Sequence, residues 1–434
     1  MAKQNLLNPQ GERVAIVAGL RTPFVLRDAE FKSSYATDLG TMVTNELLSR
    51  SAIERSQLDQ LVFGQVIQQP DIPNPAREIA LALNMPHLQA YTLSSSCLSG
   101  LQALVNVAGS IVSGSISAGI AGGADSISNA PFSISPRVIH KLKGIFNAPT
   151  LEQKFDLFRR FSWRDLKPHG VNLKDYMTQL SVAEMSEQMA QQFHITRAEQ
   201  DEFARHSNQK AADAWKLGVL KGEVIPSFPR PYTDFVVSDS LIPAATRQRY
   251  YDNAEPIVAK SYATVTEANM PKAVDGAAAV LLMRENRAKE LGLNPLGYIR
   301  SYAITGNDIW QNMFMGATVA SHFALERANV ELQDIDLIDI HETSASQMLV
   351  NMRLFESDEF AKNQLNRTAC IGKIDPNKLN HLGGSIAFGN PRAATSLRIL
   401  IQSLNALKRN GGGMSLVASS GLGGLGAAMV LESE

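Results

Sequence analysis

The sequence predicts an α/β fold built from two similar halves. Short apolar segments alternate with stretches whose apolar residues recur at helical spacing. The order of strand, small-residue turn, helix and glycine-bearing strand occurs twice, which suggests an internal duplication. Between about residues 126 and 260 the apolar periodicity breaks, proline recurs and charge rises. We therefore expect a largely parallel sheet with an insertion carried on the first half.

The first half is predicted to span residues 1–290, with the inserted loop domain at about 126–260. Before the insertion, strands are expected at 14–18, 61–66 and 117–124, helices at 38–48, 77–83 and 101–112, and a polar extended segment at 91–96. Within the insertion, residues 182–193 and 197–217 have the spacing of amphipathic helices. A buried-strand pattern resumes at 274–283, which marks the return to the sheet.

The second half is predicted to span residues 291–434. It should contain strands at 337–340, 414–418 and 427–431, with a small-residue turn at 383–398 that leads into a helix ending at Leu407. A glycine-rich turn at 421–426 precedes the last strand. The matching layout of the two halves is the basis for expecting a duplicated architecture.

Composition limits the possible partners and compartments. The chain has 434 residues and a formal net charge of -1, so its overall charge gives no indication of a nucleic-acid partner. Two cysteines exclude a disulfide framework and favour a reducing, cytoplasmic location. Residues 1–13 carry no apolar segment of the kind found in signal peptides. We also find no apolar run long enough for a membrane-spanning helix.

Cys97 lies at the apparent start of a helix, within a Ser-Ser-Ser-Cys-Leu-Ser-Gly segment at residues 94–100. A thiol there meets the positive end of the helix dipole and free backbone N–H groups, and both favour the thiolate. A reactive nucleophile is one interpretation, and a buried structural cysteine is the other. Cys370 has no comparable setting, and we interpret it as structural.

His341 and Glu342 end the apolar strand at 337–340. Ligands of α/β proteins bind at the carboxyl ends of parallel strands, so His341 could orient or deprotonate a reacting group. A polar pair in a solvated loop is the other interpretation. The further histidines His194, His206, His322 and His381 lack the spacing of metal ligands, and we expect no metal site.

Two glycine-rich segments lie at residues 383–391 and 421–426. Glycine lets the backbone approach a ligand or another strand closely. The first segment lacks the Gly-Lys-Ser/Thr ending of a phosphate loop. The second follows a strand, but the sequence has no acidic residue at the distance that a dinucleotide site requires. We therefore expect no nicotinamide site and no tightly bound cofactor.

Together these segments resemble the thiolases, and most closely the bacterial fatty-oxidation thiolase subunits of the trifunctional-complex type. The matching segments lie at residues 14–24, 61–66, 121–126, 275–279, 297–302 and 423–431, and the resemblance covers nearly the whole chain. It implies a five-layered α-β-α-β-α core with a loop domain in the first half. It also implies a homodimer or tetramer that transfers acyl groups from coenzyme A thioesters in fatty-acid β-oxidation.

The resemblance assigns catalytic positions residue by residue. Cys97 matches the cysteine that accepts the acyl group, and His341-Glu342 matches the His-Glu pair of this subfamily. After that pair the chain has Thr-Ser-Ala at residues 343–345, where the family usually has Ala-Phe-Ala. The segment 268–276 also lacks the serine that in the family contacts the pantetheine arm of coenzyme A, near Met270 or Pro271.

Two departures fall on catalytic positions. Asn390 stands in Gly-Asn-Pro where the family has Gly-His-Pro, and Ser420 stands where the family has a second catalytic cysteine. In the family, the histidine helps to activate the nucleophile, and the second cysteine moves protons to and from the substrate α-carbon or the leaving thiol. A serine hydroxyl is far too weak an acid to take over that role directly. The resemblance therefore implies altered chemistry at this site.

Two alternative functions remain open. Initiating ketoacyl synthases share the fold and use a Cys-His-Asn set, which Cys97, His341 and Asn390 reproduce. Their decarboxylating condensation needs no base at Ser420, because loss of CO₂ creates the carbanion, and His341 and Asn390 could stabilise the enolate oxygen. The second alternative is a catalytically impaired scaffold subunit of a fatty-oxidation complex. The overall similarity favours a thiolase-class acyltransferase and leaves the direction of the reaction open.

Residues 151–167 carry basic side chains interleaved with aromatic ones. The basic residues are Lys154, Arg159, Arg160, Arg164 and Lys167, the aromatic ones are Phe155, Phe158, Phe161 and Trp163, and Lys141 and Lys143 extend the charge upstream. A solvated helix is one interpretation. The other is a surface that binds an anionic membrane or a hydratase/dehydrogenase partner subunit, which the resemblance supports.

Overall fold

The computed structural model describes residues 6–159, 170–171, 174–311 and 313–434. These residues form two compact units. The first lies within Met1–Val66, Asn74–Asn129 and Lys174–Glu434, and the second within Ile67–Pro73 and Ala130–Leu173. The first unit holds the sheet and every residue discussed for catalysis.

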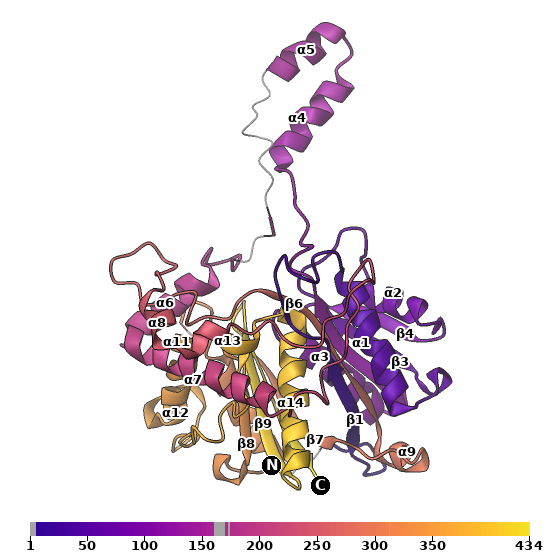
Figure 1. The fold of residues 1–434 in the computed structure, drawn as a ribbon, viewed down its shortest axis with the longest axis vertical. Coiled ribbons are helices and arrows are strands. Elements are labelled where there is room, and N and C mark those ends of the chain that lie inside the picture. Colours follow the sequence, from indigo (N-terminus) through magenta and orange to yellow (C-terminus); the bar gives the residue numbers. More distant parts are fainter. Residues whose placement is uncertain (1–5, 160–169, 172–173, 312) are drawn as a thin grey trace. The chain divides into compact units, whose positions relative to one another are not determined.

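The first unit is organised on a continuous sheet in the order β4-β3-β5-β6-β1-β7-β10-β9-β8, with β2 paired to β6 (Figure 1). The strands are β1 (Val14–Arg21), β2 (Val25–Leu26), β3 (Gln60–Gly64), β4 (Gln89–Leu93), β5 (Ala118–Asp125), β6 (Val274–Arg284), β7 (Gly297–Gly306), β8 (Leu337–Ile340), β9 (Gly413–Gly421) and β10 (Leu425–Ser433). The predicted strands are thus confirmed, and β2 and β7 are additional ones.

The expectation of a largely parallel sheet is wrong. Within the described residues, parallel pairing is confined to β3 with β4 and β5, and to β8 with β9. The central strands pair antiparallel, from β5 through β6, β1, β7 and β10 to β9. Strand-helix alternation implies parallel pairing only where a helix directly links neighbouring strands. Here a tight turn joins β9 to β10, and the long insertion separates β5 from β6.

Helices cover both faces of this sheet (Figure 1). In the first unit they are α1 (Ala36–Ser51), α2 (Pro75–Ala82), α3 (Ser99–Val112), α6 (Val182–Gln192), α7 (Arg197–Lys216), α8 (Gln248–Asp252), α9 (Glu285–Glu290), α10 (Gly316–Ala328), α11 (Ala345–Phe355), α12 (Asp358–Gln364), α13 (Ser385–Phe388) and α14 (Thr395–Arg409). The predicted pair α6 and α7 is confirmed, and Ser181 and Thr196 cap the N-termini of these helices, each within a capping box.

Alternating side chains along the strands explain why the fold has five layers. In β6, Val280 joins the core formed with α3 and α14, whereas Leu281 joins the core under α1 and α2. In β10, Met429 faces the α3 and α14 core, whereas Val430 faces the core under α10 and α11. Strand side chains alternate between the two faces of a sheet, so each half of the sheet is covered on both sides. The predicted α-β-α-β-α core is confirmed, with α3 and α14 as the central layer.

The second unit contains α4 (Pro136–Asn147) and α5 (Leu151–Arg159), which pack against each other. Part of the predicted basic segment, namely Arg160, Phe161, Trp163, Arg164 and Lys167, lies outside the described residues. Over the part of the chain that the structure describes, no helix is both long and apolar enough to cross a membrane.

Candidate active site

Cys97 lies in a sharp turn between β4 and α3. The preceding Ser96 has a φ of 53°, a left-handed conformation that is uncommon for a residue with a side chain. The Ser99 hydroxyl holds this turn, because it accepts from the Ser95 N–H at 2.8 Å and donates to the Ser96 carbonyl at 2.6 Å. Cys97 is buried and two residues before the start of α3. The predicted position at the positive end of a helix is therefore confirmed.

A second loop brings Asn390 to Cys97. Gly389 has a φ of 83°, and a Cβ there would clash with the Val274 side chain, so only glycine fits. The Asn390 N–H then donates to the Lys272 carbonyl at 2.9 Å, which ties this loop to the segment before β6. On the other side of the loop, Gly123 of β5 leaves room for the Ala393 carbonyl. These close approaches fix the Asn390 backbone beside the cysteine turn.

The orientation of the Asn390 amide follows from its partners. Its Oδ1 accepts from the Arg392 N–H at 2.8 Å and from the Thr395 hydroxyl at 2.9 Å. With Oδ1 engaged in this way, Nδ2 faces the cysteine and donates to Cys97 Sγ at 3.5 Å. The opposite contact, from Sγ to Oδ1, is longer at 3.8 Å and competes with two better donors. An N–H directed at sulfur stabilises the thiolate more than the thiol.

Thr395 was not identified from the sequence, and its role can be tested. Replacing Thr395 with valine removes one of the two donors that hold Oδ1, so the amide should rotate and present oxygen to the sulfur for part of the time. A hydrogen bond of about 0.5–1.5 kcal/mol corresponds to roughly a 2- to 10-fold slower alkylation of Cys97 by iodoacetamide. Peptide mass spectrometry measures this rate, with Cys370 alkylation as the internal reference.

The matched control for this variant is Thr395→Ser, which retains the hydroxyl and should alkylate at the parent rate. Equal rates in the valine and serine variants would show that Thr395 does not orient the amide.

His341 follows β8 and is fully buried. Its backbone N–H donates to the Ala418 carbonyl of β9, and its ring Nδ1 lies 2.8 Å from the Ser385 hydroxyl. Its Nε2 is buried without a partner among the described residues. Burial, together with nearby Arg398 and Arg392, lowers the pKa of His341 to about 3. The imidazole is therefore neutral at physiological pH, and the arrangement favours hydrogen bonding over the deprotonating role considered from the sequence.

Glu342, the neighbour of His341, is a structural group. Its carboxylate accepts from the Ser207 hydroxyl, the Asn380 side chain and the Ile386 N–H, at distances from 2.8 to 3.1 Å. Burial raises the pKa of Glu342, and these bonds oppose the rise. The carboxylate thus joins α7 to the loop that carries His341 and to α13.

Ser420 of β9 is committed to the backbone of a neighbouring segment. Its hydroxyl donates to the Phe314 carbonyl at 3.0 Å and accepts from the Ala317 N–H, in the first turn of α10, at 2.9 Å. The side chain is fully buried. The next residue, Gly421, lies against the cysteine turn, and the Leu422 N–H donates to the Ser96 hydroxyl. Ser420 is therefore near the site, but its hydroxyl stabilises the start of α10.

The four residues singled out from the sequence thus converge. Asn390 contacts Cys97 directly, and Gly389 beside it bonds through its N–H to the Ser385 carbonyl, while the Ser385 hydroxyl contacts His341. The structure does not bring the other histidines together. His322 contacts Arg367, His206 pairs with Glu202 and His381 is partly buried. Among the described residues, no cluster of side chains could hold a metal ion.

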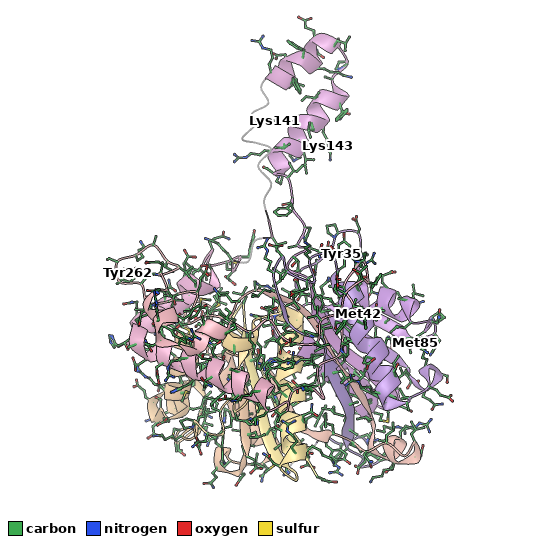
Figure 2. The ribbon with its side chains drawn as sticks, viewed as in Figure 1. Tyr35, Met42, Met85, Lys141, Lys143 and Tyr262 are labelled. Atoms are coloured by element: carbon green, nitrogen blue, oxygen red, sulfur yellow. The ribbon has the colours of Figure 1, made fainter. Side chains whose placement is uncertain are left out.

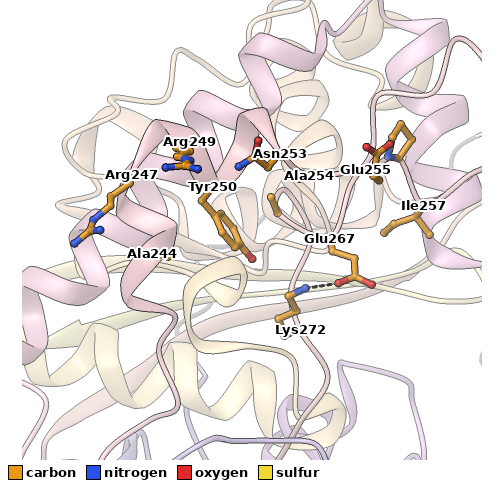
Figure 3. A pocket seen from close by; sticks show the side chains of 12 residues that line it. Ala244, Arg247, Arg249, Tyr250, Asn253, Ala254, Glu255, Ile257, Glu267 and Lys272 are labelled. Carbon is orange, nitrogen blue, oxygen red and sulfur yellow. Dashed lines mark hydrogen bonds and ion pairs between the residues drawn. The ribbon is translucent and has the colours of Figure 1, made fainter.

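A cavity of about 850 Å³ opens beside this site (Figure 3). It is lined by Ala244, Arg247, Arg249, Tyr250, Asn253, Ala254, Glu255, Pro256, Ile257, Glu267, Ala268 and Lys272. Figure 3 shows Arg249 and Tyr250 on α8, across the cavity from the ion pair between Lys272 and Glu267, which is 2.7 Å long. The Lys272 carbonyl accepts from the Asn390 backbone N–H. The cavity wall at Lys272 is therefore in direct contact with the loop that carries Asn390.

Two family models match the chain. The model described as thiolase, N-terminal domain, matches residues 14–286, and that described as thiolase, C-terminal domain, matches residues 293–433. A 3-ketoacyl-CoA thiolase from Shigella flexneri serotype 5b is 47% identical over 430 residues, which is 99% of each chain. A 3-ketoacyl-CoA thiolase from Vibrio cholerae is 46% identical over 435 residues, covering 100% of each.

Two solved structures share the fold of this chain over nearly their whole length. An acetyl-CoA acetyltransferase from Bacillus anthracis has a TM-score of 0.83 at 27% identity, over 98% of this chain and 99% of that one. Human mitochondrial 3-ketoacyl-CoA thiolase in complex with CoA has a TM-score of 0.82 at 27% identity, over 100% of both chains.

Proposed function

Because the chain belongs to the thiolase family and is an acyltransferase of that class, we propose that Cys97 carries the acyl group as a thioester. The observation that supports this most directly is the thiol held at the start of α3, within hydrogen-bond distance of the Asn390 amide. The names of the relatives indicate the substrate class, a 3-ketoacyl-CoA, and we propose coenzyme A as the acceptor.

The chemistry needs a nucleophile and a hydrogen-bond donor to the oxygen of the carbonyl group that is attacked. The Cys97 thiolate attacks the carbonyl carbon, and the negative charge moves to the carbonyl oxygen. His341 can stabilise that charge if the Ser385 hydroxyl donates to Nδ1, because the proton then resides on the otherwise unpartnered Nε2. Asn390 donates to the sulfur but cannot accept its proton, since an amide is not a base.

The cavity beside Asn390 is our proposed binding site for the coenzyme A part of the substrate. Arg247, Arg249 and Lys272 supply positive charge that suits phosphate groups, and Tyr250 supplies an aromatic face. Met270 and Pro271, where the family has a serine, lie on the same segment between the lining residues Ala268 and Lys272. Coenzyme A would be bound as part of the substrate, and we propose no tightly bound cofactor.

A labelling experiment tests the proposal. The protein is incubated with an isotope-labelled acyl-CoA, digested, and the peptide containing Cys97 is weighed. The expected result is a mass increase equal to the acyl group on Cys97 alone. An unmodified Cys97 peptide across acyl chains of several lengths would contradict the proposed nucleophile.

The alternative functions are not favoured. The relatives described above are thiolases, whereas neither a condensing ketoacyl synthase nor a non-catalytic scaffold accounts for identity of about half the residues to these enzymes. The Cys97, His341 and Asn390 set that suggested a synthase is equally compatible with acyl transfer between thiols.

Several broader features of the enzyme remain proposals. We propose two halves that meet near residue 290, with the insertion at about 126–260 as a loop domain, and a homodimer or tetramer in solution. A place in fatty-acid β-oxidation follows from the substrate class. Cys97 and Cys370 are both free, and a nucleophilic thiol must stay reduced, which supports a cytoplasmic location.

The helix pair α4 and α5 is our proposed contact with an anionic membrane, or with a hydratase/dehydrogenase partner subunit. Over residues 136–159 it carries five basic and two acidic residues. Figure 2 labels Lys141 and Lys143 on α4. Large apolar side chains of the same helices are exposed, among them Phe146, Phe155 and Phe158. Basic residues beside exposed aromatic ones are typical of surfaces that bind membrane interfaces.

Sedimentation with anionic vesicles tests the membrane contact. We expect binding at low salt that is lost at high salt, because each basic residue near the surface contributes about 1 kcal/mol. The charge-reversal variant Lys143→Glu/Lys154→Glu/Arg159→Glu should fail to sediment. The matched control Lys32→Glu/Lys362→Glu/Lys373→Glu changes the charge equally elsewhere and should still bind. Loss of binding in both variants, or no binding at low salt, would leave only the partner subunit, to be sought by co-purification.

A further inference from the structure

We propose that this enzyme exchanges acyl groups between thiols at least about 100-fold faster than it makes or breaks a carbon–carbon bond. This inference rests on the proposed function, since it assumes an acyl group on Cys97. The ability of the site residues to give or accept protons determines which reaction the site supports best.

Thiol exchange needs no proton carrier. The Cys97 thiolate attacks the thioester carbonyl, a carbon–sulfur bond to Cys97 forms, and the carbon–sulfur bond to coenzyme A breaks. The electron pair leaves on the coenzyme A sulfur as a thiolate. A second coenzyme A thiolate reverses these steps and carries the acyl group away. The charge on sulfur is conserved throughout, so the donors seen here suffice, namely the Asn390 Nδ2 and a neutral His341.

Carbon–carbon cleavage has a further requirement. When Cys97 attacks the 3-keto carbon, the bond to the α-carbon breaks and its electron pair remains on that carbon as a thioester enolate. A proton must be delivered to this carbon before acetyl-CoA can leave, and the reverse reaction must remove one. A nearby group that exchanges protons near neutral pH therefore determines the rate of this step.

The three polar groups around Cys97 do not meet that requirement. The Asn390 amide neither gives nor takes a proton under these conditions, and His341 is buried and uncharged. The Ser420 hydroxyl donates a hydrogen bond to the Phe314 carbonyl and accepts one from the Ala317 N–H. Moving its proton to a substrate would break the hydrogen bond to the Phe314 carbonyl, just before α10. The geometry thus retains the means for acyl transfer and lacks a proton carrier among these residues.

Two rates measured on one preparation test the inference. The first is the transfer of isotope-labelled coenzyme A into hexanoyl-CoA, and the second is the cleavage of 3-ketohexanoyl-CoA by coenzyme A, with Cys97→Ala as the blank for both. We expect exchange to exceed cleavage by about 100-fold or more. A smaller ratio would overturn the inference, while acylation of Cys97 would still support the proposed function. Absence of both exchange and acylation would overturn the two together.

A second measurement is independent of bond cleavage. In deuterated water, an enzyme with a proton carrier at the α-carbon introduces deuterium into acetyl-CoA. We expect exchange of labelled coenzyme A with acetyl-CoA while deuterium enters its methyl group at least about 100-fold more slowly. Deuterium incorporation at a rate similar to that of coenzyme A exchange would show that a proton carrier is present.

Discussion

Replacing Cys97 with alanine should abolish the acyl-enzyme and reduce acyl transfer to background, a loss of about 10⁴-fold or more. The reason is that no other described side chain offers a nucleophile at the start of α3 beside the Asn390 amide. Alanine removes only the sulfur from a buried position, so the turn held by Ser99 should persist. Isotope-labelled acyl-CoA, followed by intact-protein and peptide mass measurement, records the loss.

The matched control is Cys370→Ala. Cys370 is free and partly buried, and its N–H donates to Asp358 far along the chain from the site. This variant should retain full labelling of Cys97. Label that persists in Cys97→Ala, or that appears on Cys370, would refute the assignment of the nucleophile. Circular dichroism of both variants confirms that a lost signal does not reflect unfolding.

Much of the site could be predicted because its residues lie in short local motifs. The serine-rich segment before a helix placed Cys97, and the end of an apolar strand placed His341. Asn390 was selected through the resemblance, as the residue that replaces the histidine of the family's Gly-His-Pro motif. The structure adds the reason for the preceding glycine, since only glycine allows the φ of 83° at Gly389. Each of these signals depends on neighbours in sequence, and the structure confirms the positions.

The roles of the same residues could not be predicted, because they depend on distant contacts. The commitment of Ser420 to Ala317 joins residues 103 positions apart, and it requires α10. That helix was not predicted, since its alanine-rich residues are buried on most sides and leave no amphipathic stripe. The orientation of the Asn390 amide depends on Thr395, which the sequence gave no reason to select.

Restoring a proton carrier should reverse the preference for thiol exchange. In the double variant Asn390→His/Ser420→Cys, the imidazole can accept the thiol proton from Cys97. The new thiol at position 420 forms only weak hydrogen bonds to the Phe314 carbonyl and the Ala317 N–H. It is therefore freer than the serine hydroxyl to exchange a proton with the substrate. General acid–base catalysis contributes roughly 10²- to 10⁴-fold, so we expect cleavage of a 3-ketoacyl-CoA to rise by about 10²-fold.

The single variants and a neighbouring control separate this effect from a general change in the pocket. Because the two new groups act on one proton path, the gain in the double variant should exceed the product of the single gains. Ser419→Cys combined with Asn390→His places the new thiol on the opposite face of β9, as strand alternation requires, and should not raise cleavage beyond Asn390→His alone. A folded Asn390→His/Ser420→Cys variant whose cleavage rate stays at the parent value would mean that the shape of the pocket, as well as its proton chemistry, has diverged.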